Sequence, residues 1–211
     1  MDEKWSSGLV AVSRPTFVVN GSSNAKLVSQ LQYMSTLETQ DLLRCEVTFS
    51  NWENGGTGYL YSDNSIFDLN RQLQIRVGNP AIFSGRITGI TSRHPRDTAP
   101  SITITAEAPL RITGSKRRIS KSWKIVYGQS LREITIDHIF SKISGQAAAE
   151  FNGFLRVGDS IIICGVGSRF DGNYAVSEVR HLFDLQSGLR TEFRVESDEL
   201  PGKGQSLKIE N

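Results

Sequence analysis

The segment Arg44-Cys45-Glu46-Val47-Thr48-Phe49 alternates polar with apolar residues, and this period of two predicts a half-buried β-strand. The same alternation occurs in 72–77, 101–106 and 191–195. Strands of this kind place one face on a core and leave the other face for water or a partner. That arrangement is typical of antiparallel sheets rather than of doubly wound parallel sheets. The fold is therefore expected to be mainly β.

Two other segments are interpreted from local signals. Residues 26–33 are expected to form a further strand. Ser130-Leu131-Arg132-Glu133 has the pattern of a capping box, in which the serine hydroxyl and the glutamate carboxylate cap each other's backbone amides. With Gly145 as a stop signal, it predicts one amphipathic helix over about 130–144. Its apolar side would hold Ile136, Ile139, Phe140 and Ile143.

The length of the chain indicates two domains of similar size. Its 211 residues correspond to about 1.4 domains at a usual size of roughly 150 residues. Strand-like sequence lies on both sides of the polar stretch 114–118, although no repeat of residue identity is visible. We therefore expect a first β-barrel in residues 1–112 and a second in residues 113–211, ending in a mobile tail from Pro201.

Composition excludes several classes of protein. The net charge of +2 and the 38% of apolar residues are ordinary for a globular protein, and no apolar run approaches the ~20 residues of a membrane-spanning helix. The acidic start Met1-Asp2-Glu3 lacks the apolar run of a secretory signal. Cys45 and Cys164 have no CxxC or Cys/His context and are expected to be reduced thiols.

No motif for catalysis, a metal or a cofactor stands out. The histidines His94, His138 and His181 lack the spacing of metal ligands, and there is no Gly-x-Ser-x-Gly elbow, although a triad assembled from distant positions stays open. The stretch Gly165–Gly172 runs from one expected strand into another. Because a phosphate loop must lead into a helix N-terminus, a shaped strand connection is the better interpretation. No enzyme, cofactor or metal is expected.

The aromatic and basic residues also have simpler interpretations than ligand binding. The cluster Lys116, Arg117, Arg118 and Lys121 lies close to Trp123, a pairing that can bind single-stranded nucleic acid. Such runs are more often a solvated face or a protein contact. The scattered tryptophans are interpreted as core or interface residues. Neither a membrane nor sequence-specific nucleic acid is expected as a partner.

Several segments together resemble a known family. Arg14–Gly21, Ile82–Ile90 and Tyr127–Ile134 are similar to the phage late control D family, the tail hub proteins of contractile phages, which are related to the hub half of type VI secretion spikes. The most specific part is a closing module, which contains in order Leu155-Arg156-Val157-Gly158-Asp159, Gly165-Val166-Gly167, Phe170-Asp171-Gly172-Asn173-Tyr174-Ala175-Val176, Val179-Arg180-His181-Leu182-Phe183-Asp184, Gly188 and Thr191-Glu192-Phe193.

The resemblance implies a short hub made of two tandem tail-tube-like β-barrels, without the family's peripheral insertion domains. Three chains would then present six similar barrels and adapt a sixfold tube to a threefold spike. The implied partners are two further copies, the tube protein, the spike protein and other baseplate proteins, in a virion tail or a cytoplasmically assembled injection particle. The family-motif residues, expected to be structural, are Gly85, Ser130, Gly158, Asp159, Gly165, Gly167, Gly172, Tyr174, Val176, His181, Phe183, Asp184, Thr191 and Phe193.

Two alternatives remain beside the hub. A tail-tube-terminating protein of the same assembly would form a ring of six copies. A β-sandwich carbohydrate-binding module would act as a monomer through exposed aromatic side chains. In the tube-like barrels, the polar members of the alternating strands are expected to face outward from the core, and Arg44, Glu46, Thr48, Thr103 and Thr105 are examples.

Overall fold

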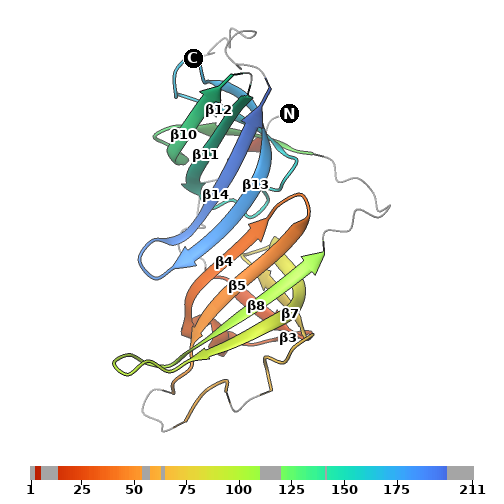
Figure 1. The fold of residues 1–211 in the computed structure, drawn as a ribbon, viewed down its shortest axis with the longest axis vertical. Coiled ribbons are helices and arrows are strands. Elements are labelled where there is room, and N and C mark those ends of the chain that lie inside the picture. Colours follow the sequence, from red (N-terminus) through yellow and green to blue (C-terminus); the bar gives the residue numbers. More distant parts are fainter. Residues whose placement is uncertain are drawn as a thin grey trace.

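Strand pairing joins both halves of the chain into one sheet in the computed structural model (Figure 1). The structure describes residues 3–5, 14–53, 58–62, 65–109, 120–140 and 142–198. The elements in chain order are β1 (Glu3–Lys4), β2 (Thr16–Val19), β3 (Ser22–Ser23), α1 (Ala25–Gln30), β4 (Leu31–Glu38), β5 (Leu42–Ser50), β6 (Gln72–Arg76), β7 (Ala81–Arg93), β8 (Ser101–Pro109), β9 (Ser122–Val126), β10 (Leu131–Ile139), β11 (Lys142–Glu150), β12 (Ser160–Cys164), β13 (Gly172–Asp184) and β14 (Gly188–Ser197). The expectation of a mainly antiparallel β fold is confirmed.

The central part of the sheet is a run of eight antiparallel strands. Their order is β7-β8-β5-β4-β13-β14-β11-β10. The remaining strands extend from the first parts of β7 and β13: β6, β2 and β3 follow β7, whereas β12, β9 and β1 follow β13. In Figure 1 the first-half strands lie below and the second-half strands above, with β4 and β13 at the border.

The first hairpin of each half has the same pairing. Tyr33 of β4 lies opposite Thr48 of β5, and Glu133 of β10 lies opposite Ala148 of β11, so both members of the pair are displaced by 100 residues. The bulge between Leu31 and Tyr33 recurs between Leu131 and Glu133 at the same displacement. The strands β10 and β11 are therefore the counterparts of β4 and β5.

The second hairpin of each half is repeated as well. Ile87 of β7 pairs with Ala106 of β8, and Val176 of β13 pairs with Val195 of β14, a displacement of 89 residues for both members. A bulge follows Ile87 and Val176 alike. The two hairpins of each half also pair with each other in the same register. Ser50 of β5 lies opposite Ser101 of β8, and the corresponding Glu150 of β11 lies opposite Arg190 of β14. Each half thus contains the same four-stranded unit in the same register.

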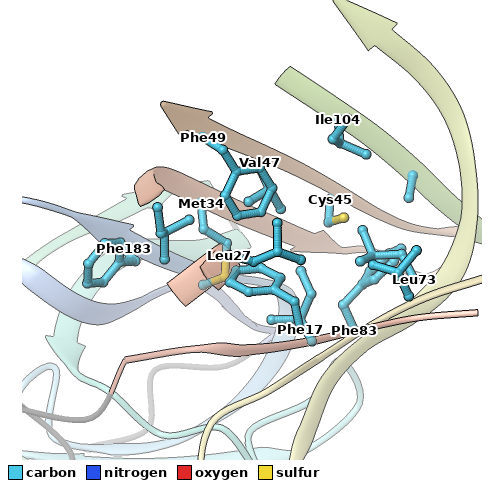
Figure 2. Packing of buried hydrophobic residues seen from close by; sticks show 14 of the residues in the cluster. Phe17, Leu27, Met34, Cys45, Val47, Phe49, Leu73, Phe83, Ile104 and Phe183 are labelled. Carbon is cyan, nitrogen blue, oxygen red and sulfur yellow. The ribbon is translucent and has the colours of Figure 1, made fainter. Parts of the chain in front are cut away.

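Buried apolar side chains form two clusters. The first contains Phe17, Phe49 and Phe83 of the first half, and Phe183 of β13 packs beside it (Figure 2). The second contains Trp123 and Phe193 of the second half together with Trp5, which follows β1 near the start of the chain. The expected border at 112/113 lies outside the described residues, so the two-domain division stays a prediction.

The predicted helix over 130–144 is wrong. Residues of this segment form β10, a turn at Phe140 and the first part of β11. Ser130 does not cap a helix, and its carbonyl instead accepts a hydrogen bond from the Glu150 amide at 3.0 Å. The physical reason is that Ile134, Thr135 and Ile136 are β-branched and alternate between the two faces, which suits a strand paired to a neighbour.

The strand expected at 26–33 is also wrong in its first part. Ala25–Gln30 form the short helix α1, whose N-cap Asn24 accepts a hydrogen bond through its side chain from the Lys26 amide at 3.0 Å. The strand β4 begins only at Leu31. None of the described helices is long and apolar enough to span a membrane.

The expected barrels are open in the described residues. Each half is a chain of paired strands whose two ends are not joined by a further ladder, apart from an isolated bridge between Tyr127 and Leu131 in the second half. The outer edge of β10 and the edge of β7 beyond Arg86 have no strand partner in the described parts of the chain. The eight-stranded run therefore ends in two available edges.

Gly85 is required by close packing. A Cβ atom built there would lie 2.6 Å from the Glu107 carbonyl oxygen and 2.6 Å from Phe83 Cζ. We expect Gly85→Ala to lower the free energy of unfolding by about 1–3 kcal/mol, because the backbone of β8 cannot yield easily. Urea denaturation measures this. Gly89→Ala on the same strand is the control, since its nearest neighbour is 3.5 Å away, and equal losses in both variants would contradict the argument.

Candidate functional site

The two repeated units meet at a main-chain seam between β4 and β13. The seam is antiparallel, with Val179 opposite Glu38 and Asp184 opposite Tyr33. The first part of β13 uses the same edge to pair with β12. One edge of β13 therefore serves both halves of the chain, and the hydrogen bonds of the seam fix their relative register.

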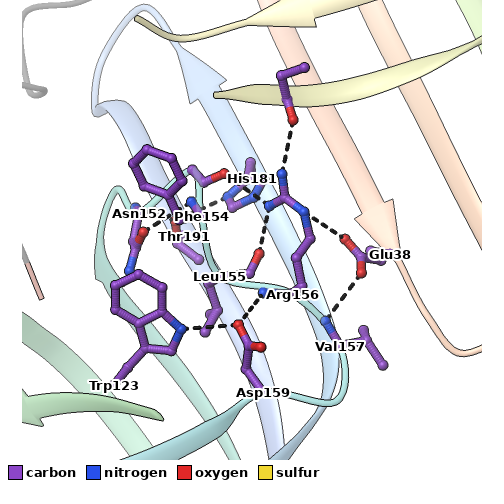
Figure 3. Close-up of polar contacts among 12 residues, drawn as sticks. Glu38, Trp123, Asn152, Phe154, Leu155, Arg156, Val157, Asp159, His181 and Thr191 are labelled. Carbon is purple, nitrogen blue, oxygen red and sulfur yellow. Dashed lines mark hydrogen bonds and ion pairs between the residues drawn. The ribbon is translucent and has the colours of Figure 1, made fainter. Parts of the chain in front are cut away.

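A partly buried ion pair links side chains across the seam. Arg156 Nε lies 3.6 Å from Glu38 Oε2 of β4, and the Arg156 guanidinium also donates to the carbonyl of Ala81 on β7 at 2.9 Å (Figure 3). The Val157 amide donates to Glu38 Oε1 at 3.2 Å. Because both charged side chains are mostly buried and several hydrogen bonds satisfy them, they link the segment before β12 to the first half.

Asp159 organises the same segment from the other side. Its side chain is almost fully buried, and it accepts hydrogen bonds from the amides of Lys121 and Arg156 and from Trp123 Nε1, at 3.0–3.1 Å. A buried carboxylate with three donors is well satisfied and holds its neighbours in place. Asp159 thereby connects Arg156 to the core around Trp123 (Figure 3).

His181 lies on the core side of the seam. Its Nδ1 is 3.1 Å from the hydroxyl of Thr191, which also accepts a hydrogen bond from the Asn152 amide at 2.9 Å. Burial, with a smaller contribution from the Arg156 guanidinium, lowers the pKa of His181 to about 3. The imidazole is therefore neutral at physiological pH, which suits a structural role.

The low pKa of His181 makes stability depend on pH. Between about pH 6.5 and pH 3 the unfolded chain binds a proton that the folded chain does not, so the free energy of unfolding falls as the pH drops. His181→Gln is expected to reduce this slope, which is on the order of 1.4 kcal/mol per pH unit for one group. Urea denaturation at pH 7, 5.5 and 4 measures it. His138→Gln is the control, and an unchanged slope in His181→Gln contradicts the assignment.

The face of the eight-stranded run opposite the cores is mostly polar, although Tyr33, Leu37 and the buried Leu182 lie on it at the seam. The residues Arg44, Glu46, Thr48, Thr103 and Thr105 lie on this face, as expected, and Thr48 bonds to Thr103 at 2.9 Å. Oppositely charged neighbours cover much of the rest. The ion pairs are Arg44–Glu107, Arg180–Glu178, Arg194–Glu178, Arg190–Asp184 and Arg190–Glu192. This polar face is continuous from one repeated unit into the other.

An open depression lies on the polar face of the second unit. Its volume is about 610 Å³, and β10, β11 and β14 line it. The charged lining residues are Glu133, Asp137, Glu192 and Glu196 with Arg194. The depression is broad and charged rather than enclosed and apolar, so it has the character of an exposed surface and not of a small-molecule pocket. The described residues contain no group of three or more His, Cys, Asp or Glu side chains that could hold a metal ion.

Some of the predicted motif residues are brought together. Gly158, Asp159 and Val176 share two backbone hydrogen bonds of 2.9 Å, and His181 contacts Thr191. Tyr174, Val176 and Phe193 belong to the second core cluster, whereas Phe183 belongs to the first. Asp184 accepts from the amides of Gln186 and Ser187 and forms the β13–β14 turn, and its bond from Arg190 lowers the pKa of its carboxyl.

The other motif residues shape the backbone at separate places. Gly165, Gly167 and Gly172 have φ angles of 83°, 101° and 150° in the connection from β12 to β13, which is a shaped strand connection as expected. Gly85 lies in the first half and Ser130 in the turn before β10. The motif residues thus lie at the seam, in the second core and in several separate turns, and they do not gather in one chemical site.

The remaining sequence candidates do not form a ligand site. Trp5 and Trp123 are buried in the second cluster, and Lys121 lies over the Trp123 ring at 5.3 Å. The basic residues 116–118 lie outside the described residues, as does the tail from Pro201. His94, His138 and His181 do not gather: His94 makes an edge-to-face contact with Tyr59, and His138 lies near Arg169.

Sequence reasoning missed the pair formed by Glu38 and Arg156. These residues are far apart along the chain, and neither belongs to a local motif that announces an ion pair. The sequence offers only the residue types as a weak signal of the repeat: Asn and Gly adopt positive φ more readily than other residues, and Asn70 before β6 and Gly158 before β12 do so, at 66° and 83°.

The comparisons with known proteins agree on the fold. No protein-family model matches the sequence, and no curated protein matches it. The tail protein from Neisseria meningitidis MC58 is similar in structure with a TM-score of 0.59 at 6% identity, over 90% of this chain and 98% of that chain. The 43 kDa tail protein of prophage MuSo2 from Shewanella oneidensis gives a TM-score of 0.58 at 6% identity, over 87% of this chain and 96% of that chain.

A third solved structure belongs to a secretion system. The E. coli c3393 protein, described as a component of the type VI secretion system with structural similarity to the T4 bacteriophage tail proteins gp27 and gp5, has a TM-score of 0.50 at 9% identity. The match covers 79% of this chain and 73% of that chain. The chain therefore has the fold of phage tail proteins, and the resemblance to tail hub proteins is confirmed at the level of the fold.

Proposed function

We propose that this chain is a structural hub of a contractile phage tail or a related injection system, where three copies join a sixfold tube to a threefold spike. The observation that carries this proposal is the repeat: β4, β5, β7 and β8 recur as β10, β11, β13 and β14 with the same register and the same bulges. One chain thus presents two similar units, and three chains present six.

Symmetry explains why such a chain is useful. Six similar surfaces arranged in a ring can each contact one subunit of a sixfold tube, while the three chains can each contact one strand of a threefold spike. The seam between β4 and β13 supports this role, because it sets the angle between the two units of a chain by main-chain hydrogen bonds. The tube, spike and other baseplate proteins are the proposed partners.

The polar face is the proposed lining of the ring. It carries threonine and paired charges over both units, with Leu37 and Leu182 between them at the seam, and the depression on the second unit is open and lined by charged side chains. A surface of this composition is hydrated and has few exposed apolar patches, which suits the lining of a channel through which cargo passes. The three similar solved structures named above are phage tail or secretion-system proteins, which supports a structural role rather than catalysis.

The number of copies tests the proposal. We expect native mass spectrometry of the purified full chain to give a mass of three chains, and electron microscopy to show a ring with a central hole. A mass of six chains would replace the hub by a tail-tube-terminating ring. A monomer that binds on a glycan array would instead support a carbohydrate-binding module, and a monomer with no ring at any concentration would also overturn the proposal.

A further inference from the structure

The eight-stranded run ends in two edges that correspond to the two strands of the seam. At one end, the part of β7 beyond its bulge is the counterpart of the part of β13 that pairs with β4. At the other end, β10 is the counterpart of β4. Within one chain the counterparts of these edges pair with each other. The seam therefore shows that two strand edges with this backbone geometry can pair with each other.

We propose that β10 of one copy pairs with β7 of the next copy in the register of the seam. This inference rests on the proposed ring and specifies how its chains are joined. Transferring the seam by the displacements of 100 and 89 residues places Ile90 opposite His138, because Val179 lies opposite Glu38. By the same transfer, Thr91 lies opposite Asp137 and Arg93 opposite Thr135.

The backbone around β7 supports this equivalence. The Gly158 amide donates to the Val176 carbonyl and the Val176 amide to the Asp159 carbonyl, both at 2.9 Å. In the first half, the Asn70 amide donates to the Ile87 carbonyl at 2.8 Å and the Ile87 amide to the Arg71 carbonyl at 2.9 Å. Hence the backbone around the bulge has the same arrangement in β7 and in β13. The unpaired edge of β7 therefore corresponds to the edge of β13 that pairs with β4.

Side chains on the core side are more exposed at the free edges than at the seam, as expected for edges that a neighbouring copy would cover. On the core side of the seam, Val179 and His181 of β13 and Thr36 of β4 are buried. At the free edges, the corresponding Ile90 is 38% exposed, and Ile136 is only partly buried. A neighbouring copy would cover these apolar side chains as the seam covers their counterparts.

Charge is complementary on the polar side of the proposed contact. Arg93 would lie opposite Thr135, and the diagonal neighbours of Thr135 on the same face of β10 are Glu133 and Asp137. Diagonal positions across a strand pair are within reach of an arginine side chain. A one-residue shift would turn Arg93 away from both carboxylates, whereas a two-residue shift would keep it beside one of them. The charges therefore support the contact, and disulfide crosslinks decide its register.

Exposed apolar side chains gather at one end of the same contact. At the seam, Val157 donates its amide to Glu38. The segment before β12 is displaced by 88 residues from the segment before β6, because the Gly158 amide and the Asn70 amide make equivalent hydrogen bonds. The counterpart of Val157 is therefore Leu69, which is 59% exposed, and the counterpart of Glu38 is His138. Directly after His138 come Ile139 and Phe140, whose exposed fractions are 63% and 97%. The proposed pairing brings these three apolar side chains of neighbouring copies to one place.

Cysteine pairs test the register. In a Cys164→Ser background, Thr91→Cys with Asp137→Cys is expected to give disulfide-linked dimers and closed trimers on a non-reducing gel, because residues directly opposite in an antiparallel pair are within disulfide reach. The matched internal pair, Leu37→Cys with Arg180→Cys, should form its disulfide within one chain. The shifted pair, Thr91→Cys with Thr135→Cys, lies on the diagonal and should stay largely unlinked.

A charge exchange provides the second readout. Arg93→Asp is expected to weaken the ring by about tenfold or more, since it faces the carboxylates of the neighbouring copy. Combining it with Asp137→Arg should restore most of the loss, a rescue that a merely destabilised strand would not show. Sedimentation or native mass spectrometry over a dilution series measures both variants.

The outcomes separate the inference from the proposed function. Rings of three chains that fail to crosslink through Thr91→Cys and Asp137→Cys would overturn the strand pairing and leave the hub standing. Linked species larger than trimers would keep the pairing but replace the trimer by a larger ring. A native mass of one chain at all concentrations would overturn both.

Discussion

The pairing of β4 with β13 is the constraint on which the rest of the structure depends. Side chains of a strand alternate between two faces, so the register of the seam decides which residues of both units face the cores and which face outward. A slip by one residue would turn His181 and Phe183 onto the polar face. The seam therefore makes one polar surface out of two units, and the loops and turns around it follow from that alignment.

Side chains add specificity to a main-chain contact that any strand could make. At the seam, Glu38 meets Arg156, whereas the counterpart of Glu38 on β10 is His138 and the counterpart of Arg156 is Asp68. If β10 replaced β4 beside β13, the partly buried Arg156 would lose its carboxylate partner, which is costly where water is partly excluded. The chain thus distinguishes its own seam from the proposed contact between copies, although both use the same backbone geometry.

The strands were predictable from the sequence, but their arrangement was not. Alternation identified the strand around Val47 because polar and apolar residues alternate strictly there. The spacing of the apolar residues from Ile136 to Ile143 fits a helix as well as a hairpin, and the pairing of β11 with β14 stabilises the hairpin. The repeat left no trace in residue identity, because Phe49 and its counterpart Ala149 fill their cores with different volumes. Backbone register is conserved where residue identity is not, and the seam joins segments that no local pattern connects.

The two units share a backbone register but differ in the side chains at their edges, as the proposed adaptor role would require. Identical units would make the seam and the contact between chains interchangeable, and β10 could then pair with β13 as easily as with β7. Such a chain could close alone or grow into rings of any size. Because the two contacts share a register but differ in charge and in apolar exposure, a chain can hold its own two units in a fixed order while still offering the same geometry to a neighbour. The proposed contact between copies thus uses a backbone geometry that the two units share, while their unequal side chains keep it distinct from the seam within one chain.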